Sequence, residues 1–273
     1  MKIIKFWKMS GSGNDFVVID NRRHALRGNL SRWAKILCHR QFGVGADGLL
    51  LLEKDKTEDF RMVYYNADGS RADMCGNGAR CMAWFAHEQK AVGNVFRFRT
   101  DAYPVGAKVR GAVVQISLAD ARDYRREVVA KVNGKTYRPA FVNTGVPHAV
   151  LVVPNAYKIF VSDLGRALRF HKAFGPRGTN VNFVQKIGAN KLRVRTYERG
   201  VEGETLACGT GVVASAIGAA LRGLVKSPVR CVVAGGDTLE VQFDMHSENQ
   251  ARPATNILLK GPVRLTFKGD YYV

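Results

Sequence analysis

The sequence predicts an α+β protein that consists of two copies of one domain. Short strand-like runs alternate with helix-forming segments, and their order in the first half of the chain recurs in the second half. Similar residues also surround Cys75 and Cys208, at corresponding points of the two halves. The 273 residues, 46% of them hydrophobic and 24% charged, suffice for two globular domains and exclude a disordered or collagen-like chain.

The first half begins with two strand-like runs that a Gly-rich turn separates. Residues 31–40 favour a helix with Ser31 as its N-cap, because Trp33, Ile36 and Leu37 fall on one face. Polar turn residues separate the segments that follow. Further strands are expected at 49–53, 60–65, 95–99, 104–109 and 113–118, and a second helix at 74–89.

The second half of the chain is expected to repeat this order of elements. The polar residues 119–124 mark the boundary, and a last strand at 263–267 returns to the first domain. We therefore expect one domain to comprise residues 1–118 with 262–273, and the other to comprise residues 119–261. The elements expected in the second domain are strands at 137–144, 148–153, 182–186 and 192–197, and helices at 163–170 and from Cys208 onward.

Matching residues set the register of the two copies. Residues 75–78 (Cys-Gly-Asn-Gly) align with residues 208–211 (Cys-Gly-Thr-Gly), and each segment follows a strand and a polar loop. Upstream, the run around Asn14 resembles the run around Asn180. These two asparagines are therefore expected at equivalent positions of the two domains.

The chain is strongly basic, with 42 Lys and Arg residues against 23 Asp and Glu residues and a formal net charge of +19. An excess of this size attracts nucleic acid, anionic membranes or acidic small molecules. The basic residues are scattered through strand-like segments and form no long block, which argues against a nucleic-acid partner. Lys2, Lys5 and Lys8 are expected to be solvated. The sequence leaves a homodimer open.

The five cysteines are an odd number, and the first residues lack the apolar core of a signal peptide. Segment 206–225 is rich in small residues, which favours a helix inside the protein over a membrane span. We therefore expect a reduced, cytoplasmic protein without a membrane partner. Cys38, Cys81 and Cys231 are expected in the core, and no metal is expected, because Cys81 and His87 lack a second cysteine pair.

Cys75 and Cys208 each precede a predicted helix, where free backbone N–H groups and the helix dipole favour negative charge. This position lowers the pKa of a thiol. The glycines beside each cysteine let a ligand approach the backbone closely. Either cysteine taken alone would more often be a core residue.

The two cysteines together predict a more specific chemistry. In a duplicated protein, two helix N-termini can face each other across an interdomain cleft and present thiols to opposite faces of one small molecule. Backbone amides there would hold a carboxylate. One thiolate could remove the proton α to that carboxylate while the other thiol delivers a proton to the opposite face. Such an inversion of a stereocentre requires no cofactor.

Several motifs resemble those of the diaminopimelate epimerase family. They occur in the family's order and cover nearly the whole chain. They are residues 11–16 (GSGNDF), 66–70 (NADGS), 74–81 (MCGNGARC), 144–148 (TGVPH), 179–183 (TNVNF), 197–200 (YERG) and 203–211 (GETLACGTG).

The resemblance implies a PLP-independent epimerase that interconverts LL- and meso-2,6-diaminopimelate in lysine and peptidoglycan precursor synthesis. It also implies that each domain wraps a mixed, largely antiparallel sheet around a central helix, with the active site in the interdomain cleft. By the same resemblance, Cys75 and Cys208 are the acid and base, and His148 and Glu198 tune them. The implied substrate-binding residues are Asn14, Asn66, Asn180, Glu198 and Arg199, with backbone donors from Gly76, Asn77, Gly209 and Thr210.

Three departures from the family pattern concern the distal end of the substrate. Val146 stands where many members have an asparagine that touches substrate, Gly48 stands where some have a glutamine, and segment 200–204 is one residue longer than in many members. A racemase of another amino acid is therefore an alternative. A non-catalytic basic binding module is a further alternative, although it has no need for two activated thiols.

Overall fold

The computed structural model describes residues 3–273, and these form two compact units. One unit comprises Met1–Ser117 and Gly261–Val273, and the other comprises Leu118–Lys260. Strands make up most of the regular structure in each unit, and each contains two α-helices within the described residues. This confirms the predicted α+β class. No helix within residues 3–273 is long and apolar enough to cross a membrane.

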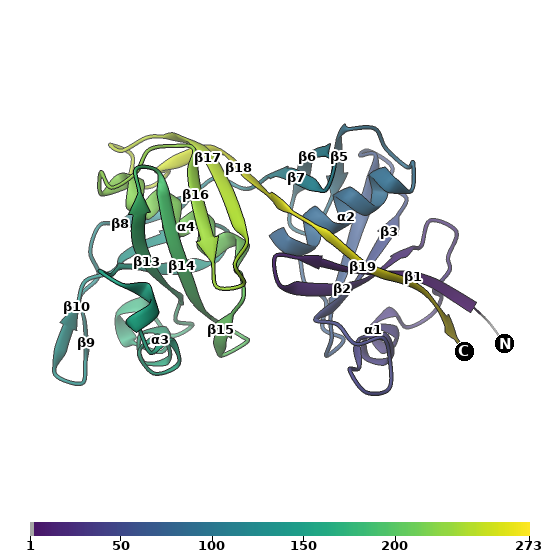
Figure 1. Ribbon diagram of the computed structural model, residues 1–273, viewed down its shortest axis with the longest axis horizontal. Helices are drawn as coiled ribbons and strands as arrows, with labels where there is room; N and C mark the ends of the chain where they lie inside the picture. The colour runs from purple at the N-terminus through teal and green to yellow at the C-terminus, as the bar shows by residue number, and fades with distance from the viewer. Residues whose placement is uncertain (1–2) are drawn as a thin grey trace. The chain divides into compact units, whose positions relative to one another are not determined.

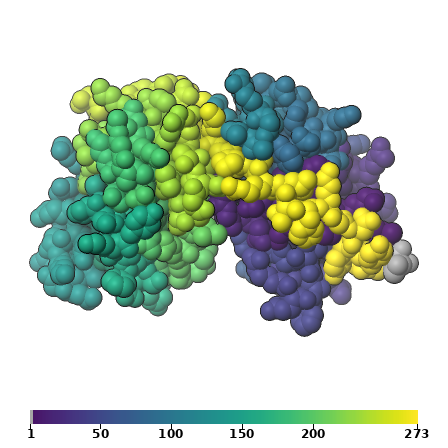
Figure 2. Space-filling model, in the orientation of Figure 1, coloured from purple at the N-terminus to yellow at the C-terminus, as the bar shows by residue number. Residues whose placement is uncertain are grey.

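The first unit contains a mixed sheet in the order β19-β1-β2-β3-β4-β5-β6-β7. Only the β2/β3 and β4/β5 pairs are parallel. The C-terminal strand β19 lies beside β1, with Ile3 opposite Tyr272 (Figures 1 and 2). The strands are β1 (Ile3–Gly11), β2 (Asn14–Asp20), β3 (Gly48–Glu53), β4 (Phe60–Asn66), β5 (Val95–Arg99), β6 (Pro104–Arg110), β7 (Val113–Ser117) and β19 (Arg264–Tyr272).

The second unit has a sheet in the order β8-β11-β12-β13-β14-β16-β17-β18, and the β12/β13 and β14/β16 pairs are parallel. The short strand β15 (Gly203–Thr205) also pairs with β14. The other strands are β8 (Arg122–Arg125), β11 (Ala140–Asn143), β12 (Pro147–Val152), β13 (Asn180–Gly188), β14 (Lys191–Glu198), β16 (Val229–Val233), β17 (Thr238–Met245), β18 (Ala254–Pro262) and the separate hairpin β9 (Ala130–Val132) and β10 (Lys135–Tyr137).

The two sheets have the same topology, which shows the duplication directly. In both, a hairpin is followed by a parallel neighbour, an antiparallel return strand, a second parallel neighbour and two further antiparallel strands. By this order β2 corresponds to β12, and β3 corresponds to β13. The predicted equivalence of Asn14 and Asn180 is wrong, because Asn14 begins β2 and Asn180 begins β13. The comparison of the two halves had matched short similar segments that belong to strands at different positions in the sheet.

A buried helix packs on one face of each sheet. Helix α2 (Gly76–Glu88) contacts β1, β2, β3, β6 and β7, and helix α4 (Gly209–Leu221) contacts β11 to β14, β16 and β17 (Figure 1). Gly78 of α2 lies against Phe16 and Leu50, and Gly218 of α4 lies against Val150. Buried residues occur on all sides of both helices, as expected for elements enclosed by a sheet.

A second helix covers the opposite face of each sheet. Helix α1 (Leu30–Cys38) packs through Leu37 onto Val17 and Leu51, and α3 (Val161–Arg169) packs through Leu168 in a cluster with Val181. Because β2 and β3 are covered on both faces, they are continuous apolar runs and do not alternate with polar residues.

The structure corrects two helix boundaries. Asn29, and not Ser31, caps α1, since its side chain accepts a hydrogen bond from the Arg32 amide at 3.0 Å. The Ser31 hydroxyl instead donates to the carbonyl of Gly69 at 2.7 Å. Helix α2 begins after Cys75, which is its N-cap, so Met74 lies outside the helix.

Candidate active site

Cys75 is the N-cap residue of the buried helix α2. Its backbone is extended, with φ −140° and ψ 119°, and its sulfur accepts a hydrogen bond from the Gly78 amide at 3.5 Å. No acidic side chain occupies the first turn of the helix. The thiol is therefore held where backbone N–H groups and the helix dipole favour the thiolate. The thiol is half-buried.

Asn77 and Asn14 form one hydrogen-bonded pair at the start of α2. Asn77 Nδ2 donates to Asn14 Oδ1 at 2.6 Å, and Asn14 Nδ2 donates to Asp47 Oδ2 at 3.1 Å. The structure thus places Asn14 beside Asn77 at the start of the helix that Cys75 caps. All three were predicted as site residues. Sequence reasoning missed Asp47, although its place in a glycine-rich turn after a predicted helix was a signal for a functional loop.

Ion pairs hold the Asp47 turn against the β1–β2 hairpin. Lys8 Nζ lies 2.7 Å from Asp15 Oδ2, and Arg40 contacts both Asp15 and Asp47. Burial alone would raise the pKa of Asp15, but the hydrogen bonds from Lys8 and Arg40 hold it below its ordinary value. The expectation that Lys8 is solvated is wrong, because its side chain is 9% exposed in this pairing, whereas that of Lys5 is 83% exposed. Lys2 lies outside the described residues.

Asn66 closes the turn that follows β4. Its Nδ2 donates to Ser70 Oγ at 2.9 Å, and its Oδ1 accepts from the Tyr64 hydroxyl at 2.7 Å. The next residue, Ala67, donates to the Asp47 carbonyl at 3.0 Å, which places this turn beside the Asp47 turn. A side chain at Gly48 would meet the Tyr64 ring, since a Cβ there would lie 2.5 Å from it. The glycine that departs from the family pattern is thus required by Tyr64.

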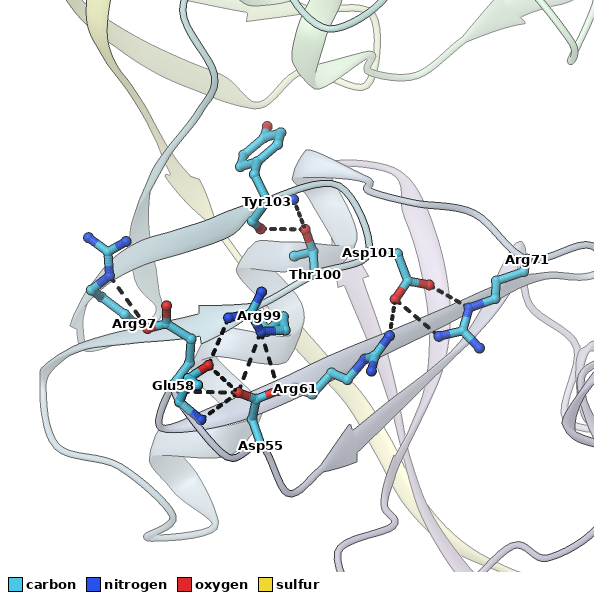
Figure 3. Close-up of polar contacts among 10 residues, drawn as sticks. Asp55, Glu58, Arg61, Arg71, Arg97, Arg99, Thr100, Asp101 and Tyr103 are labelled. Carbon is cyan, nitrogen blue, oxygen red and sulfur yellow. Dashed lines mark hydrogen bonds and ion pairs between the residues drawn. The ribbon is translucent and has the colours of Figure 1, made fainter.

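The loop between Asn66 and Cys75 is tied to the sheet by Asp101. Arg71 pairs with this carboxylate, and Arg61 Nη2 on β4 lies 2.6 Å from it (Figure 3). These contacts lower the pKa of Asp101, with Arg71 the larger influence. Neighbouring Arg99 and Asp55 form a second pair in the same cluster (Figure 3). These arginines are therefore paired with carboxylates that hold the loop in place.

Cys208 is the N-cap residue of α4 in the second unit. Its backbone is extended, with φ −115° and ψ 110°, and its sulfur lies 3.5 Å from Thr210 Oγ1. The side chain is nearly buried, with 7% of the residue exposed. Thr144 Oγ1 donates to the Thr210 carbonyl at 3.1 Å and fixes the first turn of the helix. Residues 208–211 therefore present the same cysteine and backbone amides as residues 75–78.

Asn180 positions the turn that carries Glu198 and Arg199. Its Oδ1 accepts from the Arg199 amide at 2.8 Å, and its Nδ2 donates to the Pro147 carbonyl at 3.0 Å. Thr205 Oγ1 donates to Glu198 Oε2 at 2.9 Å. The structure thus brings Asn180, Glu198 and Arg199 together where β13 begins and β14 ends. Sequence reasoning missed Thr205.

Several arginines gather around this turn. Burial, followed by the charges of Arg169 and Arg177, lowers the pKa of Arg199. Glu202, in the segment that is longer than in many family members, has φ 56° and accepts from Arg169 Nε at 3.1 Å and Nη2 at 2.9 Å. The corner remains rich in positive charge, which suits a carboxylate ligand.

His148 lies at the start of β12 and is fully buried. Burial and the positive charge of Arg199 lower its pKa to about 3, so the imidazole is neutral near pH 7. Its Nδ1 lies 3.1 Å from Asn182 Nδ2. Asn182 was not singled out from the sequence, because only the parallel pairing of β12 with β13 brings it to His148.

The other three cysteines differ from Cys75 and Cys208. Cys38, Cys81 and Cys231 are buried, and burial raises the pKa of each thiol to about 12. These thiols remain protonated at neutral pH and serve as core residues. Within residues 3–273, no group of three or more His, Cys, Asp or Glu side chains is arranged to hold a metal ion.

Comparisons with known proteins by family model, by sequence and by structure agree with one another. The sequence model of the family described as diaminopimelate epimerase matches residues 6–117 and 140–265. A protein of that name from Aquifex aeolicus is 44% identical and is covered over 97% of both chains. One from Chlorobaculum tepidum is 42% identical, with 96% of this chain and 98% of the relative covered. A solved probable proline racemase from Agrobacterium radiobacter K84 has the same fold, with a TM-score of 0.74 at 16% identity over 99% of this chain and 92% of that one.

Proposed function

Since the chain belongs to the diaminopimelate epimerase family, we propose that it interconverts LL-2,6-diaminopimelate and meso-2,6-diaminopimelate. The observation that carries this proposal is the pair of N-cap cysteines, Cys75 on α2 and Cys208 on α4, at equivalent points of the duplicated topology. A two-sided proton transfer requires two such groups, and the other three thiols are buried and protonated.

In the proposed reaction, one cysteine acts as a thiolate and takes the α-proton of the substrate. The second cysteine, as a thiol, gives a proton to the opposite face of the same carbon. After one turnover the two sulfurs have exchanged protonation states, and the enzyme is ready for the reverse direction. No cofactor is needed if hydrogen-bond donors stabilise the charge that develops on the α-carboxylate.

The proposed donors are backbone amides at the starts of the two helices. They belong to Gly76 and Asn77 on α2, and to Gly209 and Thr210 on α4. Amides at helix N-termini commonly bind anions, because the helix dipole and the backbone N–H groups there favour negative charge. His148 and Glu198 are proposed to tune the reactivity of the thiols.

The distal end of diaminopimelate carries a second ammonium and carboxylate group. We assign the carboxylate to Arg199, whose guanidinium lies in the arginine-rich corner, and the remaining polar contacts to Asn14, Asn66, Asn180 and Glu198. A guanidinium can bind a carboxylate with two parallel hydrogen bonds. Val146 supplies no polar contact, so the distal group depends more strongly on Arg199.

The test is a specificity assay with the purified protein. LL-diaminopimelate and a panel of other L-amino acids are incubated separately, and the isomer ratio is followed by chiral chromatography. We expect LL-diaminopimelate to reach a mixture with the meso isomer and the other amino acids to react far more slowly. Faster racemisation of a monocarboxylic amino acid would contradict the proposed substrate and indicate that Val146 marks another specificity.

The proposed cellular role follows from the proposed reaction. Its product serves lysine and peptidoglycan precursor synthesis, and we place the enzyme in the cytoplasm, where its thiols stay reduced. The proposed partner is the small amino-acid substrate.

A further inference from the structure

A buried chain of hydrogen bonds holds the imidazole of His148. Asn182 Nδ2 lies 3.1 Å from His148 Nδ1 and 3.1 Å from the carbonyl oxygen of Ala149. Thr196 Oγ1 donates to Asn182 Oδ1 at 2.9 Å. His148 and Asn182 are 0% exposed and Thr196 is 3% exposed, so bulk water does not compete for these groups.

The carbonyl of Ala149 determines which way the Asn182 amide faces. A carbonyl oxygen only accepts hydrogen bonds, so the atom beside it must be the NH₂ group of Asn182. The second hydrogen of that group is then donated to His148 Nδ1, which must be an acceptor. A neutral imidazole that accepts at Nδ1 carries its proton at Nε2.

The other nitrogen of the ring is left with an unused donor. Among residues 3–273, His148 Nε2 is buried and has no hydrogen-bond partner. Buried donors without an acceptor are rare in folded proteins, and such a group can still donate to a ligand or an ordered water. An N–H group at this position suits an acceptor-only group with negative charge, such as a thiolate sulfur or a carboxylate oxygen.

Building on the proposed function, we propose that Asn182 is a positioning residue that holds His148 as the neutral Nε2–H tautomer. His148 then serves the reaction as a hydrogen-bond donor to an anionic group and does not act as a base. Thr196 and the Ala149 carbonyl support this role by fixing the orientation of the Asn182 amide.

Two further observations agree with this role. A Cβ atom at Gly211 would lie 2.4 Å from Asn182 Oδ1 and 3.3 Å from Cys208 Cβ, so the Asn182 amide packs against the helix start that carries Cys208. Burial and the charge of Arg199 also lower the pKa of His148 to about 3. A second proton at Nδ1 would in addition face the NH₂ group of Asn182.

The direct test is the tautomer of His148 in the resting enzyme. In ¹⁵N-histidine-labelled protein near pH 7, two-bond ¹⁵N–¹H correlation spectra distinguish protonated from unprotonated ring nitrogens, and His148→Gln assigns the signal. We expect a protonated Nε2 and an unprotonated Nδ1. Asn182→Asp replaces the NH₂ donor by an acceptor and should move a proton to Nδ1. Asn155→Asp, which changes the partly exposed cap of a short 3₁₀ turn, should leave the spectrum unchanged.

A protonated Nδ1 in the unsubstituted enzyme would overturn the proposal. So would an Nε2–H tautomer that persists in Asn182→Asp, because Asn182 would then not determine it. These spectra need no substrate, so they are independent of the proposed reaction. Failure to epimerise diaminopimelate would contradict the proposed function and leave the tautomer result intact.

Kinetics test whether the donor is what the reaction uses. His148→Gln retains an N–H donor and removes the imidazole base, whereas His148→Leu removes both. We expect kcat of the glutamine variant to exceed that of the leucine variant by about tenfold or more. A hydrogen bond that supports a reacting group commonly contributes about this much. Equal loss in both variants, with the fold intact by circular dichroism, would contradict the donor role.

Discussion

At the scale of single residues, the position of each thiol determines its reactivity. Cys75 and Cys208 are the N-cap residues of buried helices, where backbone N–H groups favour the thiolate form. Cys38, Cys81 and Cys231 lie among apolar atoms, which raises their pKa to about 12. The same side chain is therefore a core residue at three positions, and at the other two we propose that it is an acid–base group.

Alanine variants of the two N-cap cysteines should separate epimerisation from proton exchange. Cys75→Ala and Cys208→Ala should each lower kcat for epimerisation by three orders of magnitude or more, about 4 kcal/mol of barrier, because one face of the carbon loses its proton donor or acceptor. The remaining thiol should still exchange the α-proton of one isomer in deuterated water. Mass spectrometry of each recovered isomer measures this exchange. Cys231→Ala is the control and should retain activity, and near-normal epimerisation by either N-cap variant would refute the assignment.

Alkylation should distinguish the same two groups of thiols. At pH 8 iodoacetamide should modify Cys75 first, because it is the half-buried thiol at a helix start. Cys38, Cys81 and Cys231 should stay unmodified until the protein unfolds, since their pKa of about 12 leaves almost no thiolate. Peptide mapping over time gives the order. Early labelling of the three core cysteines would show that they are not protected in this way.

At the scale of elements, we propose that the turn between β14 and β15 binds the distal end of the substrate. Asn180 holds the Arg199 amide, and Glu202 joins the same turn to Arg169 at the end of α3. The longer segment thus contacts α3 through Glu202. We propose that this contact positions Arg199 for its ligand.

Glu202→Gln should weaken substrate binding more than catalysis. Loss of the charged contact with Arg169 frees the turn, so KM for diaminopimelate should rise about tenfold while kcat changes little. Burial alone would raise the pKa of Glu202, but hydrogen bonds from the Gly200 amide and Arg169 lower it. The pairing is therefore complete above the ordinary carboxyl pKa, and KM of the unsubstituted enzyme should rise only as the pH falls below about 4.5.

Steady-state kinetics from pH 4 to 8 check this prediction. Glu127→Gln, which breaks a more exposed pair with Arg138, is the matched control and should leave KM unchanged. An unchanged KM in Glu202→Gln would mean that the Asn180 contact alone holds the turn.

The start of α4 should tolerate no added atom. Gly211→Ala would place a Cβ 2.4 Å from Asn182 Oδ1, so we expect a loss of about 1 to 3 kcal/mol in the free energy of unfolding together with lower kcat. Gly93→Ala adds the same atom where nothing lies within 4 Å and should be nearly neutral. Denaturant unfolding measures the difference. Equal stability of the two variants would show that the Asn182 amide can move aside.

At the scale of the whole molecule, the duplication explains how much could be predicted. The strands of the first unit, strands β11 to β14 of the second unit, both cysteine-bearing helices and the family could be inferred, because their signals are local: turn residues, apolar periodicity and short motifs. Strands β8 to β10 and β15 to β18 were not predicted. The prediction that Asn14 and Asn180 are equivalent was wrong, and so was the prediction that Lys8 is solvated. Both depend on which strands become neighbours, and that is determined by tertiary packing.

The contacts that sequence reasoning missed are of the same kind. Asp47 and Asn182 contact Asn14 and His148, which are 33 and 34 residues away in sequence. Thr205 contacts Glu198, seven residues away, through the pairing of β14 with β15. Apart from the glycine-rich turn around Asp47, no local pattern marks these residues. The candidate residues of the site could therefore be named from local motifs, whereas the residues that orient them required the structure.

The central claim is that two thiols transfer protons on opposite faces of one carbon, and early isotope distribution tests it most directly. LL-diaminopimelate is incubated with the enzyme in deuterated water, and both isomers are recovered after a small fraction has reacted. We predict one deuterium at the inverted carbon of the meso product and almost none in the recovered LL substrate, because the proton delivered comes from the second, solvent-exchanged thiol. A meso product that retains the original α-hydrogen, or LL substrate that gains deuterium as fast as the product, would contradict the two-thiol mechanism.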